Sequence, residues 1–194
     1  MLMRQLRHPV VASALVGLWT VASASAVQAA DWVVQTAASE IQFEYLGDGV
    51  PKTGVFERFS GSGSFDPGDP STARMQLSIE TASIDLYDTL ASGFAQSAEW
   101  FDSKNHPEVL YRLIGLSLLD GTTYVARGQL TIRGTEKPIT SEIELEIDDQ
   151  MARARGALVI VRDDYLLGVG PSAAFVEIGP EVTVRFDLKA ARAE

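Results

Sequence analysis

The sequence contains no cysteine and only two histidines, and its acidic residues outnumber its basic ones by 26 to 16. Without cysteine the protein has no disulfide, no thiolate ligand for a metal and no thiol nucleophile. A net charge of −10 repels phosphate backbones and anionic bilayer surfaces. These absences exclude a disulfide scaffold and argue against nucleic acid as a partner.

Beyond the N-terminal segment the sequence has one histidine, His106. A zinc site would have to surround this one imidazole with carboxylates, which is not the usual ligand set. A Ser/His/Asp triad would need His106 as its base, but it precedes Pro107 in a polar turn, and no serine lies on a sharp nucleophile elbow. We therefore expect no metal, no cofactor and no catalytic residue, with His106 exposed or packed in its turn.

Long hydrophobic runs are also missing, except at the N-terminus. Arg4 and Arg7 precede an uncharged stretch over residues 9–27, and small residues close it at 26–30. This is the pattern of a secretory signal. Serine, glycine and threonine interrupt the run, so we expect no stable membrane span in the mature protein. We predict a cleaved signal peptide over residues 1–30, cut after Ala29 or Ala30, and one domain over residues 31–194.

The remaining chain has a dominant period of two. Apolar and polar residues alternate over residues 41–45, 75–80, 139–147 and 182–189. In the third of these runs the even positions hold Glu142, Glu144 and Glu146, which predicts one dry face and one solvated face. Turn residues separate the runs, at 66–70, 120–121, 134–138 and 179–180. Short strands at this spacing predict an all-β antiparallel sandwich or barrel, because the helices that a parallel sheet needs are absent.

One segment breaks the period of two. From Asp85 to Phe101, apolar residues recur at steps of three and four, which predicts an amphipathic helix of about three turns. Asp85 or Asp88 is available as its N-cap, and Gly93 weakens it. We expect the helix to cross one mouth of the barrel and to bury its apolar stripe, which consists of Tyr87, Leu90, Phe94, Ala98 and Phe101.

The interior is the place where a function is expected. A closed sheet of about eight strands is just wide enough to be filled by side chains or to hold one small ligand. The candidate inward faces are aromatic and aliphatic and suit an isoprenoid or acyl chain; they carry Phe43, Tyr45, Phe56, Phe65, Tyr111, Leu130, Ile132, Leu158 and Ile160. The same residues would also make an ordinary solid core, which the residues alone favour. Glycines at 61 and 63 indicate curvature of the barrel more than a ligand site.

A charged group follows the last of these strands, where Arg162 stands beside Asp163, Asp164 and Tyr165. One interpretation is an anchor for the polar headgroup of a ligand. The other, which we favour, is a surface turn with a local ion pair worth about 0–1 kcal/mol.

Four segments, in this order along the chain, resemble the YceI-like family. They are the glycine and phenylalanine pattern of residues 54–67, the TASID stretch at 81–85 continued through Trp100-Phe101-Asp102 to His106-Pro107, the YVARGQLTIRGTEKPI stretch at 124–139, and VRDDY at 161–165. The resemblance covers nearly the whole chain beyond the predicted signal, which makes it much more specific than any one motif.

Membership implies an exported, periplasmic bacterial protein with a lipocalin-like antiparallel β-barrel of about eight strands and one short amphipathic helix packed at its side or mouth. It implies an interior that binds polyisoprenoids such as quinones or prenyl pyrophosphates, or other amphiphiles, and no catalytic residues. Trp100 and Phe101 stand where the family has its aromatic pair, and Arg162 stands at its arginine. Ala38 departs from the family, which often has a histidine there, so no headgroup or metal role is transferred to that end.

The leading hypothesis is a periplasmic carrier that holds an isoprenoid quinone, polyprenyl or fatty-acyl ligand inside the barrel. We expect a deep apolar tunnel between helix and sheet. The predicted ligand-binding residues are Phe43, Tyr45, Phe56, Phe94, Trp100, Phe101, Tyr111, Leu130, Ile132, Leu158, Ile160, Arg162 and Tyr165. The alternative is a ligand-free interaction or stress-response module with a filled barrel that uses its acidic face toward a partner. An enzyme acting on lipids ranks third, and a homodimer stays open.

Overall fold

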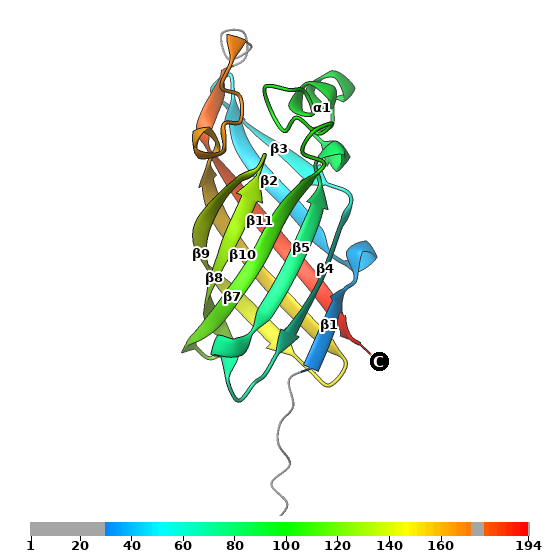
Figure 1. Ribbon diagram of the computed structural model, residues 1–194, viewed down its shortest axis with the longest axis vertical. Helices are drawn as coiled ribbons and strands as arrows, with labels where there is room; N and C mark the ends of the chain where they lie inside the picture. The colour runs from blue at the N-terminus through cyan, green and yellow to red at the C-terminus, as the bar shows by residue number, and fades with distance from the viewer. Residues whose placement is uncertain (1–29, 172–176, 194) are drawn as a thin grey trace, which may run out of the picture.

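A single antiparallel sheet curls into a barrel in the computed structural model, which describes residues 30–171 and 177–193 (Figure 1). Its strands are β1 (Ala30–Val34), β2 (Glu40–Gly47), β3 (Val50–Phe56), β4 (Phe59–Phe65), β5 (Arg74–Glu80), β6 (Ile84–Asp85), β7 (Glu108–Asp120), β8 (Thr123–Ile132), β9 (Thr135–Ile147), β10 (Met151–Val161) and β11 (Ile178–Arg192). The helices are α1 (Thr89–Ala95) and the short 3-10 turns η1 (Thr36–Ala38), η2 (Pro70–Thr72), η3 (Thr81–Ser83) and η4 (Arg162–Tyr165).

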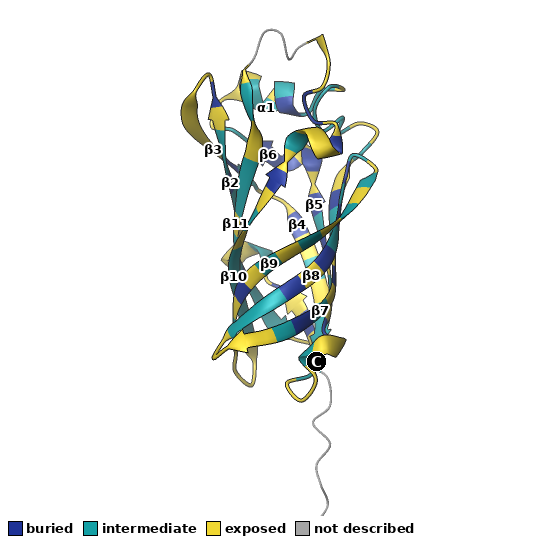
Figure 2. Cartoon of the chain, turned by 90° about the vertical axis from the view of Figure 1, so that its left-hand side faces the viewer, coloured by how far each residue is buried: buried dark blue, intermediate teal, exposed yellow. Residues whose placement is uncertain are grey.

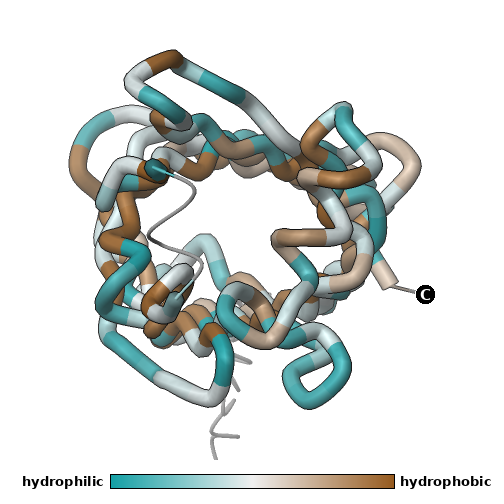
Figure 3. The backbone as a smooth tube through the Cα atoms, turned by 90° about the horizontal axis from the view of Figure 1, so that it is seen from above, coloured by the Kyte–Doolittle hydropathy of each residue, from teal (hydrophilic) through white to brown (hydrophobic). Residues whose placement is uncertain are grey.

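Eight strands close the ring, in the order β1, β4, β5, β7, β8, β9, β10 and β11, because β1 pairs back onto β11. The long β11 has two partners on one side, since Ala191 lies opposite Val33 of β1 and Val184 lies opposite Phe43 of β2. Strands β2, β3 and β6 extend the wall toward α1. Seen from above, the strands form one ring (Figure 3). The predicted all-β antiparallel barrel of about eight strands with one short helix is confirmed.

The alternating runs form strands whose two faces differ as predicted (Figure 2). In β9 the side chains of Glu142, Glu144 and Glu146 are exposed while Ile143 between them is buried. The glutamates do not stand alone, because Arg155 of β10 pairs with both Glu144 and Glu146, at 3.1 and 3.0 Å. A dry interior and a charged exterior therefore follow from the period of two.

Two of the predicted turns, at 134–138 and 179–180, differ from the structure. Arg133 and Gly134 both have positive φ, 52° and 77°, so β8 and β9 are joined by a two-residue turn and β9 already begins at Thr135. Pro138 lies inside β9, at a position that pairs with β8 but not with β10. Proline is tolerated there because the strand is an edge at that height. Pro180 likewise lies inside β11, at a break in register between Ile178 and Val182.

The predicted helix over 85–101 is wrong in length, because α1 spans only Thr89–Ala95. Asp88 is its N-cap, with a side chain that accepts a hydrogen bond from the Ala91 backbone N–H at 2.8 Å. After Ala95 the chain turns back, and the Phe101 N–H donates to the Ala95 carbonyl at 3.0 Å. Phe94 and Phe101 face inward, whereas Leu90 is 84% exposed and Tyr87 is 65% exposed, so the predicted burial of the whole stripe is also wrong.

The two ends of the barrel differ. The lower end carries the β7–β8 and β9–β10 hairpins and both ends of the described chain (Figure 1), and a buried hydrophobic cluster lies there. Its buried cluster, here named the lower plug, consists of Trp32, Phe65, Ala73, Leu113, Leu116, Ala126 and Ile143. The 3-10 turn η2 packs closely against β7 at this end, because a Cβ on Gly115 of β7 would come within 2.7 Å of the Ser71 carbonyl oxygen.

At the upper end the ladder between β9 and β10 stops. Its last pair is Gly156 opposite Ile143, and above it residues 157–161 of β10 pair only with β11. The turn η4 lies beside this opening, where Tyr165 is buried and Asp164 forms an ion pair with Lys137 of β9 at 2.8 Å. In the upper barrel the wall is therefore not closed by a ladder between β9 and β10.

Candidate ligand-binding cavity

An elongated cavity of about 280 Å³ occupies the upper barrel, between the lower plug and the α1 segment. Along β11 its lining includes Ile178 and the alternating residues from Val182 to Leu188, and the second stretch alone corresponds to about 20 Å at the usual rise of a strand. The lining is almost entirely aliphatic and aromatic. The volume lies near the lower end of the usual range for ligand pockets, about 300–1,000 Å³, so the space suits one extended chain.

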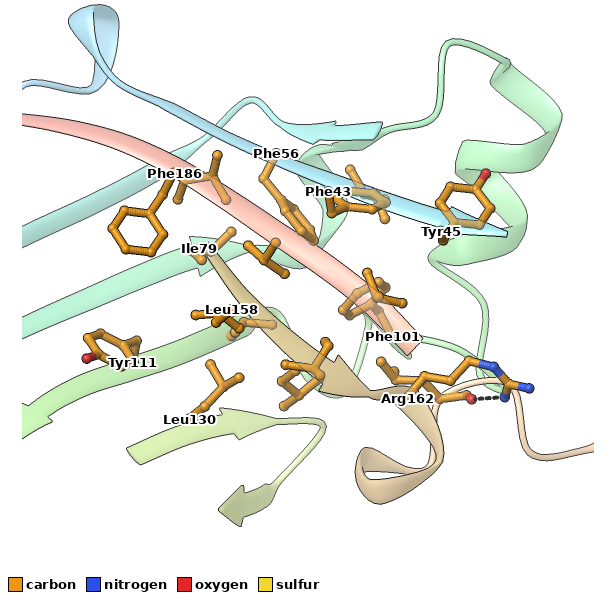
Figure 4. A pocket seen from close by; sticks show the side chains of 18 of the residues that line it. Phe43, Tyr45, Phe56, Ile79, Phe101, Tyr111, Leu130, Leu158, Arg162 and Phe186 are labelled. Carbon is orange, nitrogen blue, oxygen red and sulfur yellow. Dashed lines mark hydrogen bonds between the residues drawn. The ribbon is translucent and has the colours of Figure 1, made fainter. Parts of the chain in front are cut away.

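The cavity brings together twelve of the thirteen predicted site residues, namely Phe43, Tyr45, Phe56, Phe94, Trp100, Phe101, Tyr111, Leu130, Ile132, Leu158, Ile160 and Arg162 (Figure 4). Tyr165 is the exception: it is buried behind the wall, with the Lys137 ammonium 6.0 Å from the centre of its ring. Phe65, predicted to face inward, belongs to the lower plug and packs edge-on against Tyr124. Contact between any of these residues and a ligand stays a prediction.

Aromatic rings line the part of the cavity beneath α1. Phe56 lies 5.4 Å from Phe43 and 5.7 Å from Phe101, the second pair meeting edge to face. The ring of Phe43 fits because Gly54 stands opposite it on β3, where a Cβ would come within 2.4 Å of the ring. The shape of such a wall depends on small residues as much as on large ones, because interiors are close-packed.

Arg162 lies at the mouth but most of its hydrogen-bonding capacity is used by the backbone. It donates from Nε to the carbonyl oxygen of Gly179 at 3.1 Å, from Nη1 to that of Leu167 at 2.8 Å and from Nη2 to that of Ile178 at 3.0 Å. Nη1 also lies 2.7 Å from Asp163 Oδ1. The side chain therefore ties η4 to the start of β11, which supports the favoured interpretation of a local ion pair and adds a structural role to it.

The polar groups of the lining sit at opposite ends. Lys52 and Tyr45, which face each other across β2 and β3, lie with Arg162 at the mouth. The hydroxyls of Tyr111 and Ser141 lie toward the lower plug. Burial raises the pKa of Tyr111 to about 12, and burial also raises the pKa of Tyr45. Figure 4 shows the Tyr111 hydroxyl at the end of the cavity away from Arg162.

Comparison with known proteins agrees with this architecture. The family model described as YceI-like domain matches residues 32–190. The chain belongs to the YceI-like family. Among its curated relatives, a UPF0312 protein of Azotobacter vinelandii is 28% identical over 143 residues, covering 72% of this chain and 71% of the relative. Protein YceI of Escherichia coli O6:H1 is 28% identical over 127 residues, covering 63% of this chain and 65% of the relative.

Solved structures share the YceI-like barrel. BcnA of Burkholderia cenocepacia superposes with a TM-score of 0.74 at 27% identity, covering 80% of this chain and 98% of that one. A polyisoprenoid binding domain from Saccharophagus degradans superposes with a TM-score of 0.70 at 17% identity, covering 84% and 98%. At that identity the second likeness concerns the fold alone.

Several residues of this YceI-like cavity were not predicted from the sequence. Val182, Val184, Phe186 and Leu188 line it, and their alternation on one strand was a signal that could have placed them. Lys52 and Leu86 lie in segments without alternation, so no pattern pointed to them. Ser141 occupies an inward position of β9 although it is polar. In the sequence it stands next to the exposed glutamates, so its position was not evident.

Within residues 30–171 and 177–193, no group of three or more histidine, aspartate or glutamate side chains is arranged to hold a metal ion. No helix in these ranges is long and apolar enough to cross a membrane. His106 is half-buried in the turn before β7, where its carbonyl oxygen accepts a hydrogen bond from Thr81 Oγ1 at 2.8 Å.

Proposed function

We propose that this YceI-like protein binds one chain-like apolar or amphiphilic molecule of isoprenoid or acyl type in its upper barrel and carries it outside the cytoplasm. The observation that carries the proposal is the cavity of about 280 Å³ with its apolar lining. Each methylene transferred from water into such a lining contributes about 0.8 kcal/mol before the costs of association are subtracted. A long tail therefore binds with few polar contacts.

Two further observations support a binding role. Wall residues such as Leu158 and Phe101 line the cavity (Figure 4). The solved domain from Saccharophagus degradans with the same fold is described as polyisoprenoid binding, which is a property of that protein and makes polyprenyl compounds the first ligands to test. The cavity of the upper barrel supports the binding role over the filled-barrel alternative, which fits the lower plug. We accordingly propose a binding protein, not an enzyme.

Export is the second part of the proposal. The predicted signal lies outside the described residues except for Ala30, which is the first residue of β1 and pairs with Phe65. A cut after Ala29 leaves this strand whole, whereas a cut after Ala30 removes its first pair. We therefore favour cleavage after Ala29 and a periplasmic mature protein, which N-terminal sequencing of the secreted form tests.

The cavity itself is tested by a blocking substitution and a matched control. Leu158→Trp places a large ring in the middle of the cavity, and Val159→Trp places the same ring on the outer face of β10, where Val159 is 56% exposed. Protein from the native host is extracted with organic solvent, and the extract is analysed by mass spectrometry.

Wild type and Val159→Trp are expected to yield the same lipid near one equivalent, and Leu158→Trp little of it. Native protein that is repeatedly empty and does not take up added quinones or fatty acids would sink the proposal. Equal loading of the two tryptophan variants would place the ligand elsewhere.

A further inference from the structure

The deep end of the cavity contains two hydroxyl groups in apolar surroundings. Tyr111 of β7 and Ser141 of β9 line it together with Leu113, Ala126 and Ile143 of the lower plug. Neither hydroxyl makes a hydrogen bond with the residues that the structure describes. A hydroxyl that has left water gains free energy when it finds a partner.

The ring of Tyr111 is fixed in place. It packs against the lower plug and against a second buried cluster, which includes its strand neighbours Leu77 and Leu130. Its Cζ, which carries the hydroxyl, lies over Gly128, where a Cβ would be only 2.8 Å away. Gly128 therefore leaves the space that the ring occupies, and the hydroxyl stays at the floor of the cavity.

Ser141 lies on the strand next to Gly128. Gly128 of β8 pairs with Ile139 of β9, and Ser141 is the next inward residue toward the lower plug. Because the hydroxyl end of the Tyr111 ring lies over Gly128, both hydroxyls belong to the β8–β9 side of the floor. Both are uncharged and able to donate.

The charges of the lining lie at the other end. Lys52 and Arg162 are the cationic residues of the described lining. Arg162 lies at the end away from Tyr111 (Figure 4), and Lys52 lies opposite Tyr45 at the mouth. A carboxylate or phosphate at the floor would be buried without a counter-charge, which is strongly unfavourable. An uncharged carbonyl, ester, amide or alcohol oxygen would instead accept from the two hydroxyls.

We propose that the deep end is a recognition site for an uncharged oxygen-bearing end of a chain-like ligand, which enters first and accepts hydrogen bonds from Tyr111 and Ser141. This inference rests on the proposed ligand-binding function. It places the neutral polar end of the ligand at the floor of the cavity. The other end of the ligand then lies at the mouth, near Lys52 and solvent.

Three probes of equal carbon number test it: a straight-chain alkane, the corresponding methyl ketone and the corresponding fatty acid. Their affinities are measured by displacement of the fluorescent apolar dye phenylnaphthylamine from the full mature protein. The ketone is expected to bind about tenfold more tightly than the alkane, the size of effect that hydrogen bonds of this kind give.

Tyr111→Phe and Ser141→Ala are each expected to reduce the ratio of ketone to alkane affinity, and the double variant to remove it, while the alkane binds as before. Tyr45→Phe, which removes a hydroxyl at the mouth, is the matched control and leaves the ratio unchanged. The infrared carbonyl stretch of the bound ketone should lie at lower frequency in wild type than in Tyr111→Phe.

The outcomes separate the two claims. If alkane and ketone bind wild type equally well, or if Tyr45→Phe rather than Tyr111→Phe removes the preference, the deep-end site is wrong while ligand binding stands. Stronger binding of the fatty acid through Tyr111 would also overturn the preference for a neutral end. If none of the three displaces the dye, the proposed function fails as well.

Discussion

The lower and upper halves of this barrel share most of their strands and differ in what fills them. Below, β9 and β10 pair from Ile143 to Ile147, and the lower plug packs across the lumen. Above, the same two strands separate, and the enclosed space is a cavity. The comparison teaches that one missing stretch of ladder decides whether apolar side chains meet each other or face a hollow.

Truncating a leucine in each half is the strongest way to test this difference. Leu116→Ala in the lower plug should lower the free energy of unfolding by about 2–5 kcal/mol, because the neighbours cannot close the hole. Leu158→Ala should cost only about 1 kcal/mol, because that side chain already faces open space. Urea denaturation measures both. Equal losses would mean that the two halves are packed alike.

Alkaline titration tests the boundary between the two halves, where Tyr111 lies. Its raised pKa of about 12 means that the folded state holds the proton more tightly than the unfolded state does. The contribution of Tyr111 to the free energy of unfolding is therefore complete below pH 10. It is lost as the pH rises to about 12, a loss of about 2–3 kcal/mol.

In Tyr111→Phe most of this dependence should disappear from urea denaturation curves recorded at pH 9 to 12. A smaller slope remains from Tyr45 and Tyr165, whose pKa values burial also raises. An unchanged slope in the variant would show that Tyr111 is not the group responsible.

The upper half also depends on hydrogen bonds that hold its loops, since Arg162 ties η4 to the start of β11. Arg162→Ala leaves the carbonyl oxygens of Leu167, Ile178 and Gly179 without their donor, so we expect a loss of about 1–3 kcal/mol. The matched control is Arg185→Ala on the outer wall, where an exposed pair with Glu44 at 3.0 Å is worth about 0–1 kcal/mol. Thermal unfolding of both variants ranks them, and the reverse order would contradict the structural role of Arg162.

The smallest effect is expected on the outer face of the lower half. Glu144→Gln removes one of two carboxylates that share Arg155, both well exposed, so stability should change by less than about 1 kcal/mol. The change should shrink further in high salt. A large, salt-insensitive loss would reveal that the charged exterior, and not only the plug, holds the lower half together.

The sequence predicts the barrel well because a period of two survives in nearly every strand, including the charged edge beside Ile143 and the run that ends at Leu188. It predicts most of the cavity lining for the same reason. It does not show where the ladder between β9 and β10 ends, because that depends on pairing between residues distant along the chain, and Pro138 hints at an edge only once its neighbours are known. The sequence predicts too long a helix because Tyr87 and Leu90 match a helical period, although both side chains are exposed to solvent.

The position of the two chain ends has a practical consequence. Trp32 of β1 lies opposite Arg192 of β11, so both ends of the described chain lie side by side at the lower end of the barrel, far from the mouth (Figure 1). A surface linker or a fused reporter attached beyond Arg192 will therefore leave the mouth facing solution, and immobilised protein should load as readily as free protein.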